Sequence, residues 1–248
     1  MAQLVEFQND LSELQDIKDA ANILWQSTVW RSRDTPDISA TTRALREHYQ
    51  NSDLIVSELV PGASRLPAVD RTRIGVVVCN GDKITIAFLG ADPPSAFYEN
   101  GRQLNEGCRR TWELVKEETY SALSHAVESM AARNTNPKHI ILTGYSKGGG
   151  ISVIAFPDIL ELIRSSWGSK STLPKLWAED GNLGSLVQHL TFAALEGGTE
   201  DSYTALNLLY ETHLIRAWDF CHYDDKIAET HYYEFQDLWR GRRYHQAC

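Results

Sequence analysis

The sequence has little that would place it in a membrane, a secretory pathway or a nucleic-acid complex. It holds no run of 18 apolar residues, so we expect no transmembrane helix. Its first ten residues have neither a basic start nor an apolar core, which argues against a secretory signal. The net charge of −9 argues against non-specific binding to nucleic acid or to an anionic membrane surface. We therefore expect a cytoplasmic protein without a nucleic-acid partner.

Cysteine is also scarce, and its pattern excludes two kinds of stabilising site. The four cysteines are far apart and form no C-x-x-C pair: Cys79, Cys108, Cys221 and Cys248. This spacing favours free thiols and argues against a disulfide framework or a metal site. Internal repeats and low-complexity tracts are absent as well. With 248 residues, 42% of them hydrophobic, the chain has enough apolar material for a single domain over residues 1–248.

The most informative stretch is residues 138–156. An apolar run over 139–143 predicts a buried strand, and a second apolar run over 151–156 predicts a buried helix. Between them lies Gly144-Tyr145-Ser146-Lys147-Gly148, which has the G-x-S-x-G pattern of a nucleophile elbow. In such an elbow a serine stands on a sharp strand-to-helix turn, and small residues let the strand and the helix pass close together. A phosphate-binding loop fits less well, because G-x-x-x-x-G-K-[ST] is missing.

The rest of the chain alternates strands with helices, which predicts an α/β fold with helices on both faces of a mainly parallel sheet. Residues 1–50 are expected to form a helical N-terminal segment, and residues 52–248 the core. The expected helices span 10–30, 41–50, 105–132, 151–156 and 203–210. The expected strands span 54–60, 74–79, 84–89, 139–143, 187–194 and 213–220. Asn80-Gly81 predicts a hairpin between the second and third strands, and residues 165–184 suggest an irregular insertion.

A serine nucleophile needs a base, an acid that orients the base, and donors for the oxyanion. Where such a serine works on an α/β sheet, the acid and then the histidine follow it in the chain. The candidate acids are Asp219, Asp224 and Asp225, and the candidate bases are His222, His231 and His245. The N–H of Lys147 is the expected first oxyanion donor, and the Gly90-Ala91 turn after an earlier strand is well placed to supply the second.

Several motifs, in order, resemble the class 3 lipase family, the fungal triacylglycerol lipase type of α/β hydrolase. The segment 84–92, Ile-Thr-Ile-Ala-Phe-Leu-Gly-Ala-Asp, resembles the strand and oxyanion loop V-x-A-F-R-G-T. The segment 142–150, Leu-Thr-Gly-Tyr-Ser-Lys-Gly-Gly-Gly, resembles V-T-G-H-S-L-G-G-A. The segment 104–108 resembles the H-x-G-F start of a long helix, and 190–194 resembles the T-F-G-x-P strand. Residues 215–218 with 224–227 resemble R-V-V-N followed by D-D-P-V.

This resemblance implies an α/β-hydrolase fold and a serine hydrolase that cleaves a carboxylic ester or related acyl bond, without a metal or organic cofactor. It implies Ser146 as nucleophile and Asp225 as triad acid, with Asp219 as competitor. It implies Ala91 and Lys147 as backbone oxyanion donors. The base should be a histidine beyond the last strand. His245 fits best if 232–238 forms that strand, His231 leaves little room for a strand after Asp225, and a site with neither histidine as base stays open.

The sequence also departs from the family pattern near the expected site. Ala91 replaces a serine or threonine whose hydroxyl assists the oxyanion hole, and Tyr145 replaces a histidine. The expected lid, residues 92–103, is short and not strongly apolar, which favours a small or medium acyl substrate over a triglyceride emulsion. These departures motivate two alternatives: a non-hydrolytic cyclase or lyase on the same fold, and a catalytically dead binding module.

Overall fold

The computed structural model describes residues 11–29, 38–61, 73–90, 101–167, 180–194, 197–222 and 242–246. The helices are α1 (Leu11–Val29), α2 (Ile38–Tyr49), α3 (Gly101–Ala132), α4 (Lys147–Leu162), α5 (Asp180–Leu186) and α6 (Glu200–His213), and a π-helical turn, η3 (Ile163–Trp167), extends α4. The strands are β1 (Ile55–Leu59), β2 (Gly75–Asn80), β3 (Lys83–Phe88), β4 (His139–Tyr145), β5 (Val187–Phe192), β6 (Arg216–His222) and β7 (Arg242–Gln246).

The seven described strands form one sheet in the order β1-β2-β3-β4-β5-β6-β7. β1 and β2 pair antiparallel, as do β2 and β3, and every later pair is parallel. The predicted hairpin joins β2 to β3, where Asn80 pairs with Lys83 and Gly81 takes a positive φ of 63°. The mainly parallel α/β sheet predicted from the sequence is therefore confirmed. The carboxyl ends of its parallel strands all lie on the same side of the sheet, and ligands bind at such carboxyl ends in sheets of this kind.

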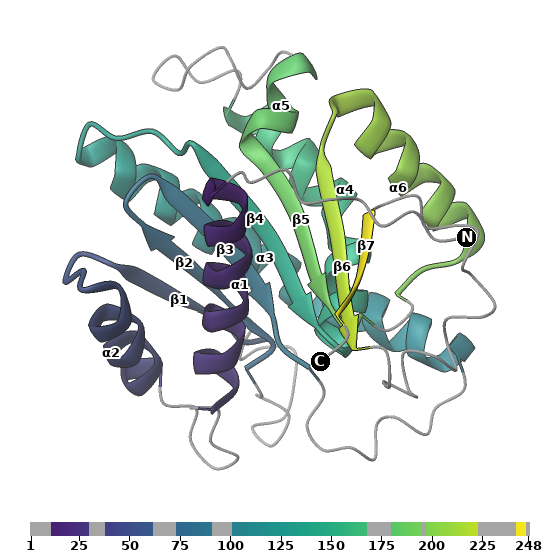
Figure 1. Cartoon of the computed structure of the whole chain (residues 1–248), viewed down its shortest axis with the longest axis horizontal. Coiled ribbons are helices and arrows are strands. Elements are labelled where there is room, and N and C mark those ends of the chain that lie inside the picture. The colour runs from purple at the N-terminus through teal and green to yellow at the C-terminus, as the bar shows by residue number, and fades with distance from the viewer. Residues whose placement is uncertain are drawn as a thin grey trace.

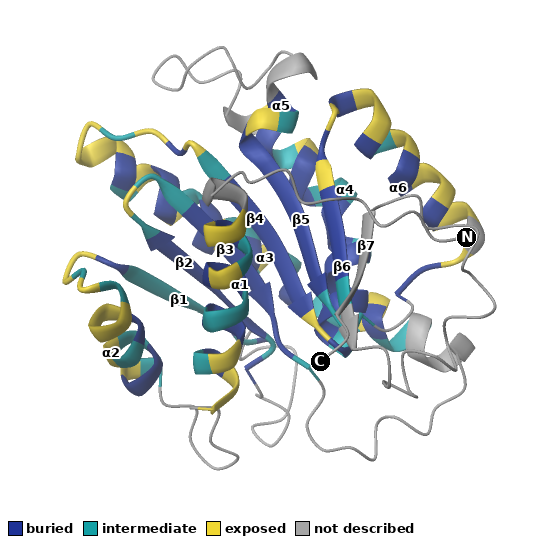
Figure 2. Cartoon of the chain, in the orientation of Figure 1, coloured by how far each residue is buried: buried dark blue, intermediate teal, exposed yellow. Residues whose placement is uncertain are grey.

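Helices cover both faces of the sheet (Figure 1). One face packs against α3, α4 and α6 in the larger core, where Trp112, Leu142 and Phe156 are almost completely buried. The other face packs against α1 and α2, where Leu24 and Leu45 share one buried cluster with Val76 and Val78 of β2. The central strands β2, β3, β4 and β5 are buried along most of their length (Figure 2). Such double burial explains why β2 and β4 read as continuous apolar runs instead of alternating ones.

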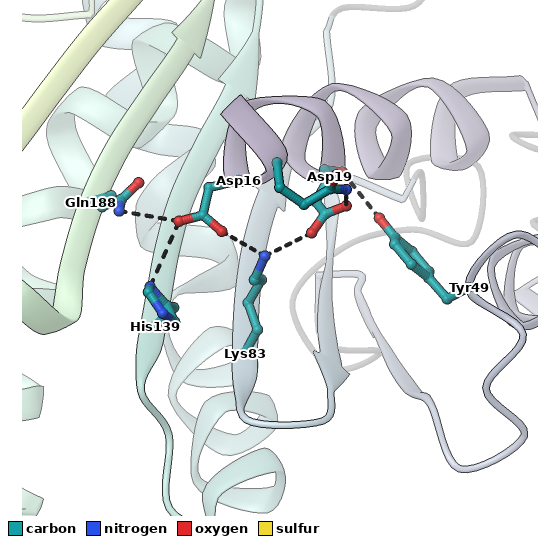
Figure 3. Close-up of polar contacts among 7 residues, drawn as sticks. Asp16, Asp19, Tyr49, Lys83, His139 and Gln188 are labelled. Carbon is teal, nitrogen blue, oxygen red and sulfur yellow. Dashed lines mark hydrogen bonds and ion pairs between the residues drawn. The ribbon is translucent and has the colours of Figure 1, made fainter. Parts of the chain in front are cut away.

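A polar cluster fixes α1 to the sheet (Figure 3). The Asp16 carboxylate accepts hydrogen bonds from the ammonium of Lys83 and from Gln188 Nε2, the latter at 3.2 Å. The Asp19 carboxylate lies 2.7 Å from the same Lys83 nitrogen, and Tyr49 Oη donates to the Asp19 carbonyl at 3.4 Å. Burial opposes the charge of Lys83, but the two carboxylates outweigh it and raise the pKa of the ammonium. The helical N-terminal segment is thus held by paired charges as well as by apolar contacts.

This cluster lies at the amino ends of the parallel strands, because Lys83 and His139 begin β3 and β4. Asp16 also faces His139 Nδ1 at 3.6 Å. The cluster is therefore at the opposite end of β4 from Ser146, and its role is to hold α1 on the sheet. None of the described helices combines the length and apolar character needed to span a membrane.

The largest difference from the predicted elements is β7, which is not among the expected strands. Other differences lie at helix ends: α2 begins at Ile38 and α3 at Gly101, before the expected starts at 41 and 105. β6 begins three residues later than expected, because α6 continues to His213 and ends at Leu214 in a left-handed conformation. The expected irregular insertion is helical at both ends, in η3 and α5.

Candidate active site

Ser146 is the one residue between the end of β4 and the start of α4, and its backbone is strained. It has φ 55° and ψ −121°, outside the regions that a serine normally occupies. Such a conformation costs on the order of 1–3 kcal/mol and persists only where the surroundings enforce it. A hydrogen bond from Ser146 N to the Phe192 carbonyl, 3.0 Å long, helps to hold it. The strand–turn–helix context that a nucleophile elbow requires is therefore present.

Three neighbouring glycines explain how the turn can be so tight. A Cβ on Gly144 would lie 2.2 Å from the carbonyl oxygen of Gly148. A Cβ on Gly148 would lie 2.1 Å from the carbonyl oxygen of Phe88 in β3, and one on Gly149 would lie 2.6 Å from Ala194 Cβ. Since real Cβ contacts do not occur at these distances, only glycine lets α4 start this close to the strands. The glycines of the motif are needed so that α4 can pass close to the strands, as the motif predicts.

The first turn of α4 offers backbone donors beside the serine. Ser146 is the N-cap of the helix, but its side chain makes no capping hydrogen bond, so the hydroxyl is not committed to the helix. Gly149 N and Gly150 N both donate to the Ser146 carbonyl, at 2.9 and 3.3 Å. Within the described residues, the N–H groups of Lys147 and Gly148 have no hydrogen-bond acceptor, as expected for the first positions of a helix. Together with the helix dipole they form a site suited to a negatively charged oxygen.

The loop after β3 lies directly against this turn. A Cβ on Gly90 would be 3.1 Å from Tyr145 Cδ1 and 3.3 Å from the Tyr145 carbonyl oxygen. Tyr145 is 48% exposed, so this contact lies at the protein surface. The beginning of the predicted oxyanion loop is thus next to the elbow. Ala91 itself lies outside the described residues, and its role as second donor stays a prediction.

The predicted acid and base are only partly described. Asp225 and His231 lie outside the described residues, as does the segment 232–238. His245 was expected beyond the last strand, but it lies within the last described strand, β7, and pairs in register with Cys221 of β6. The register places His245 at the carboxyl ends of the parallel strands, as it does Ser146, with β5 and β6 between the two residues. The contact between base and nucleophile therefore stays a prediction.

Asp219, the competing acid, lies in β6 and is 6% exposed. Its carboxylate accepts a hydrogen bond of 2.7 Å from Thr191 Oγ1 on the neighbouring strand, so it already has a structural partner.

Two features near the elbow were not predicted from the sequence. Cys108 of α3 is fully buried beneath the turn, with its sulfur 3.8 Å from the Lys147 carbonyl oxygen. Burial raises the pKa of this thiol to about 11, so it is protonated and does not compete as a nucleophile. Cys79 is also a free, buried thiol, which confirms the predicted thiol state for these two cysteines.

The second feature is His189, which no sequence motif singles out as part of a site. It lies fully inside the protein between Ser152 and Tyr210. Across the described parts of the chain, no group of three or more histidine, cysteine, aspartate or glutamate side chains could hold a metal ion.

Comparison with known proteins finds similarity in structure alone. No family model and no curated protein matches the chain. Lipase II from Rhizopus niveus matches with a TM-score of 0.54 and 14% identity, over 94% of this chain and 80% of that one. A lipase from Rhizopus microsporus var. chinensis matches with a TM-score of 0.52 and 10% identity, over 88% of this chain and 69% of that one. The chain has the α/β-hydrolase fold of these fungal lipases, and the predicted resemblance is confirmed at the level of the fold.

Proposed function

We propose that the protein is a serine hydrolase that cleaves a carboxylic ester or a related acyl bond. The observation that carries this proposal is the geometry of Ser146. Its strained backbone, its hydroxyl without a capping hydrogen bond and the N–H groups of Lys147 and Gly148, which have no acceptor among the described residues, suit acyl transfer. The shared fold with fungal lipases supports the same chemistry.

In the proposed reaction, Ser146 Oγ attacks the carbonyl carbon of the ester while a histidine accepts the hydroxyl proton. We assign the base to His245 and the orienting acid to Asp225. The N–H groups of Lys147 and Ala91 hold the negatively charged oxygen of the tetrahedral intermediate. The histidine then gives its proton to the leaving alcohol. In the second step the histidine takes a proton from water, which attacks the acyl carbon, and the proton passes to Ser146 Oγ as the carboxylic acid leaves. We expect a short or medium acyl chain, and neither a metal nor an organic cofactor is required.

A fluorophosphonate probe tests this proposal, because it reacts covalently only with an activated serine. Wild-type protein should be labelled at Ser146, and Ser146→Ala should not be labelled. Ser121→Ala is the matched control, because Ser121 is exposed on α3, and it should label like wild type. Failure of wild type to react, or equal labelling of Ser146→Ala, refutes the hydrolase and favours the binding module.

The base is assigned by hydrolysis of a short-chain p-nitrophenyl ester. His245→Ala should lose at least about 1,000-fold in kcat, since removing any triad member leaves only the contribution of binding and the oxyanion hole. His231→Ala should retain activity. The reverse pattern moves the base to His231, and retention of activity by both variants refutes both assignments.

A further inference from the structure

A buried polar chain lies under the elbow and connects α4, β5 and α6. Ser152 Oγ is 2.7 Å from the Gly149 carbonyl oxygen and 2.9 Å from His189 Nε2. His189 Nδ1 is hydrogen-bonded to the hydroxyl of Tyr210. Ser152 and His189 are almost completely buried, and Tyr210 is 7% exposed. The Phe156 ring stacks on the imidazole at 5.0 Å and fixes its plane.

The direction of each hydrogen bond in this chain follows from the number of protons. A carbonyl oxygen can only accept, so the single hydroxyl proton of Ser152 is donated to Gly149. Ser152 Oγ must therefore accept from His189, and Nε2 carries the imidazole proton. Burial lowers the pKa of His189 to about 3, so the ring is neutral and Nδ1 has no proton. The Tyr210 hydroxyl then donates to Nδ1.

The chain continues through peptide units to the oxyanion donor. The Gly149 carbonyl and the Gly150 N–H belong to one peptide group, and this N–H donates to the Ser146 carbonyl at 3.3 Å. The Ser146 carbonyl and the Lys147 N–H belong to the next such group. An amide whose carbonyl accepts a hydrogen bond becomes a stronger donor at its N–H, because the bonds polarise one another. All the donors from Tyr210 to Lys147 therefore point the same way.

We propose that Tyr210, His189 and Ser152 are positioning residues for the oxyanion hole, forming a buried hydrogen-bond chain that orients and polarises the N–H of Lys147. This role rests on the proposed hydrolase function, and it assigns a catalytic contribution to three side chains that do not touch the substrate. It also explains why buried positions of β5 and α4 carry a histidine and a serine, where apolar side chains would otherwise be expected.

The expected effect on catalysis follows from two general magnitudes. Losing an oxyanion donor costs about 100- to 1,000-fold in kcat, and cooperative strengthening amounts to about 10–30% per bond. Removing the Tyr210 hydroxyl should therefore lower kcat by a factor of about two to eight. The loss should appear in kcat and leave KM unchanged, because the polarised N–H acts on the charge that develops in the transition state.

Tyr210→Phe is the variant that breaks the chain with the smallest change in shape. Its matched control is Tyr49→Phe, which removes a half-buried tyrosine hydroxyl on the opposite face of the sheet; that hydroxyl donates to the Asp19 carbonyl. We expect Tyr210→Phe to lower kcat for a short-chain p-nitrophenyl ester two- to eightfold with KM unchanged, and Tyr49→Phe to keep the wild-type kcat. Affinity for an alkylboronic acid, whose serine adduct places a charged oxygen in the hole, should fall by the same factor in Tyr210→Phe. Equal kcat values for the two variants overturn the proposal.

Nitrogen NMR of the histidine side chains provides a readout that needs no activity. In wild type, His189 should show a protonated Nε2 and an unprotonated Nδ1 that do not titrate between pH 5 and pH 8. The opposite tautomer, or titration near neutrality, overturns the chain itself. Wild-type protein that is inactive and unlabelled by fluorophosphonate refutes the hydrolase and the catalytic role together. An active wild type with the wrong tautomer refutes only the chain.

Discussion

Acidification should reveal the buried His189 through the stability of the protein. The pKa of His189 is lowered by burial from 6.5 to about 3, so the folded protein does not take up this proton until the pH is very low. The unfolded chain takes it up near pH 6.5. Between these two values the unfolded state binds one more proton, so stability falls as the pH falls, by about 1.4 kcal/mol per pH unit. From pH 7 to pH 5 the expected loss from this residue is about 2 kcal/mol.

Urea unfolding of wild type and His189→Gln at pH 7 and pH 5 measures this contribution. Glutamine does not titrate, so the variant should lose about 2 kcal/mol less than wild type over this interval. The variant should also be less stable at pH 7 by about 1–3 kcal/mol, because the buried hydroxyls of Ser152 and Tyr210 lose their hydrogen bonds to the imidazole. His125→Gln is the control, since His125 is exposed on α3, and it should follow the wild-type pH dependence.

The comparison between the two proteins removes the contribution of the carboxylates, which titrate in both. Equal losses in wild type and His189→Gln would refute the reasoning, because they would show that His189 is protonated in the folded state over this range. The tautomer derived for the hydrogen-bond chain would then fail with it.

Three further substitutions test other parts of the structure. Gly148→Ala places a Cβ 2.1 Å from the Phe88 carbonyl oxygen and should abolish fluorophosphonate labelling; wild-type labelling would show that α4 does not start where described. Lys83→Met leaves two buried carboxylates of α1 without a cation and should cost about 3–5 kcal/mol in urea unfolding. Lys138→Met, which breaks an ion pair of a 73% exposed lysine, should cost less than about 1 kcal/mol, and equal losses would contradict the role of the α1 cluster. Leu214→Gly removes a left-handed leucine that is 73% exposed and should raise stability by up to about 1 kcal/mol in thermal unfolding; a lower Tm would contradict this.

Local patterns were sufficient to predict most of the fold. The apolar runs of β2 and β3 and the Asn80-Gly81 turn identified the hairpin, and the G-x-S-x-G motif identified the elbow. The end of α6 was misplaced because a left-handed helix end is usually marked by glycine, whereas here it is Leu214. The residue type gave no stop signal, so the apolar run after it was extended backwards into the helix.

The site was predictable only where a short motif defines it. Ser146 and Lys147 can be identified from the residues next to them in the motif. The contacts of His189 are not, because its partners lie 37 residues before it and 21 residues after it in the chain. Their alignment depends on how α4, β5 and α6 pack, which no local periodicity encodes. The oxyanion contact of Ala91 and the roles of Asp225 and His245 stay predictions for the same reason, since they depend on segments brought together over long distances.

The close contacts of the elbow glycines have a consequence for folding. Gly148 touches the backbone of Phe88, Gly149 touches Ala194, and the Ser146 amide bonds to Phe192, so the turn contacts the ends of β3 and β5 as well as its own strand. The reactive backbone geometry thus depends on three assembled strands, and a fragment containing only β4 and α4 lacks the contacts to β3 and β5 that help to enforce it. The rate at which Ser146 becomes reactive toward a covalent label during refolding would therefore measure how fast β3, β4 and β5 pair in their native register.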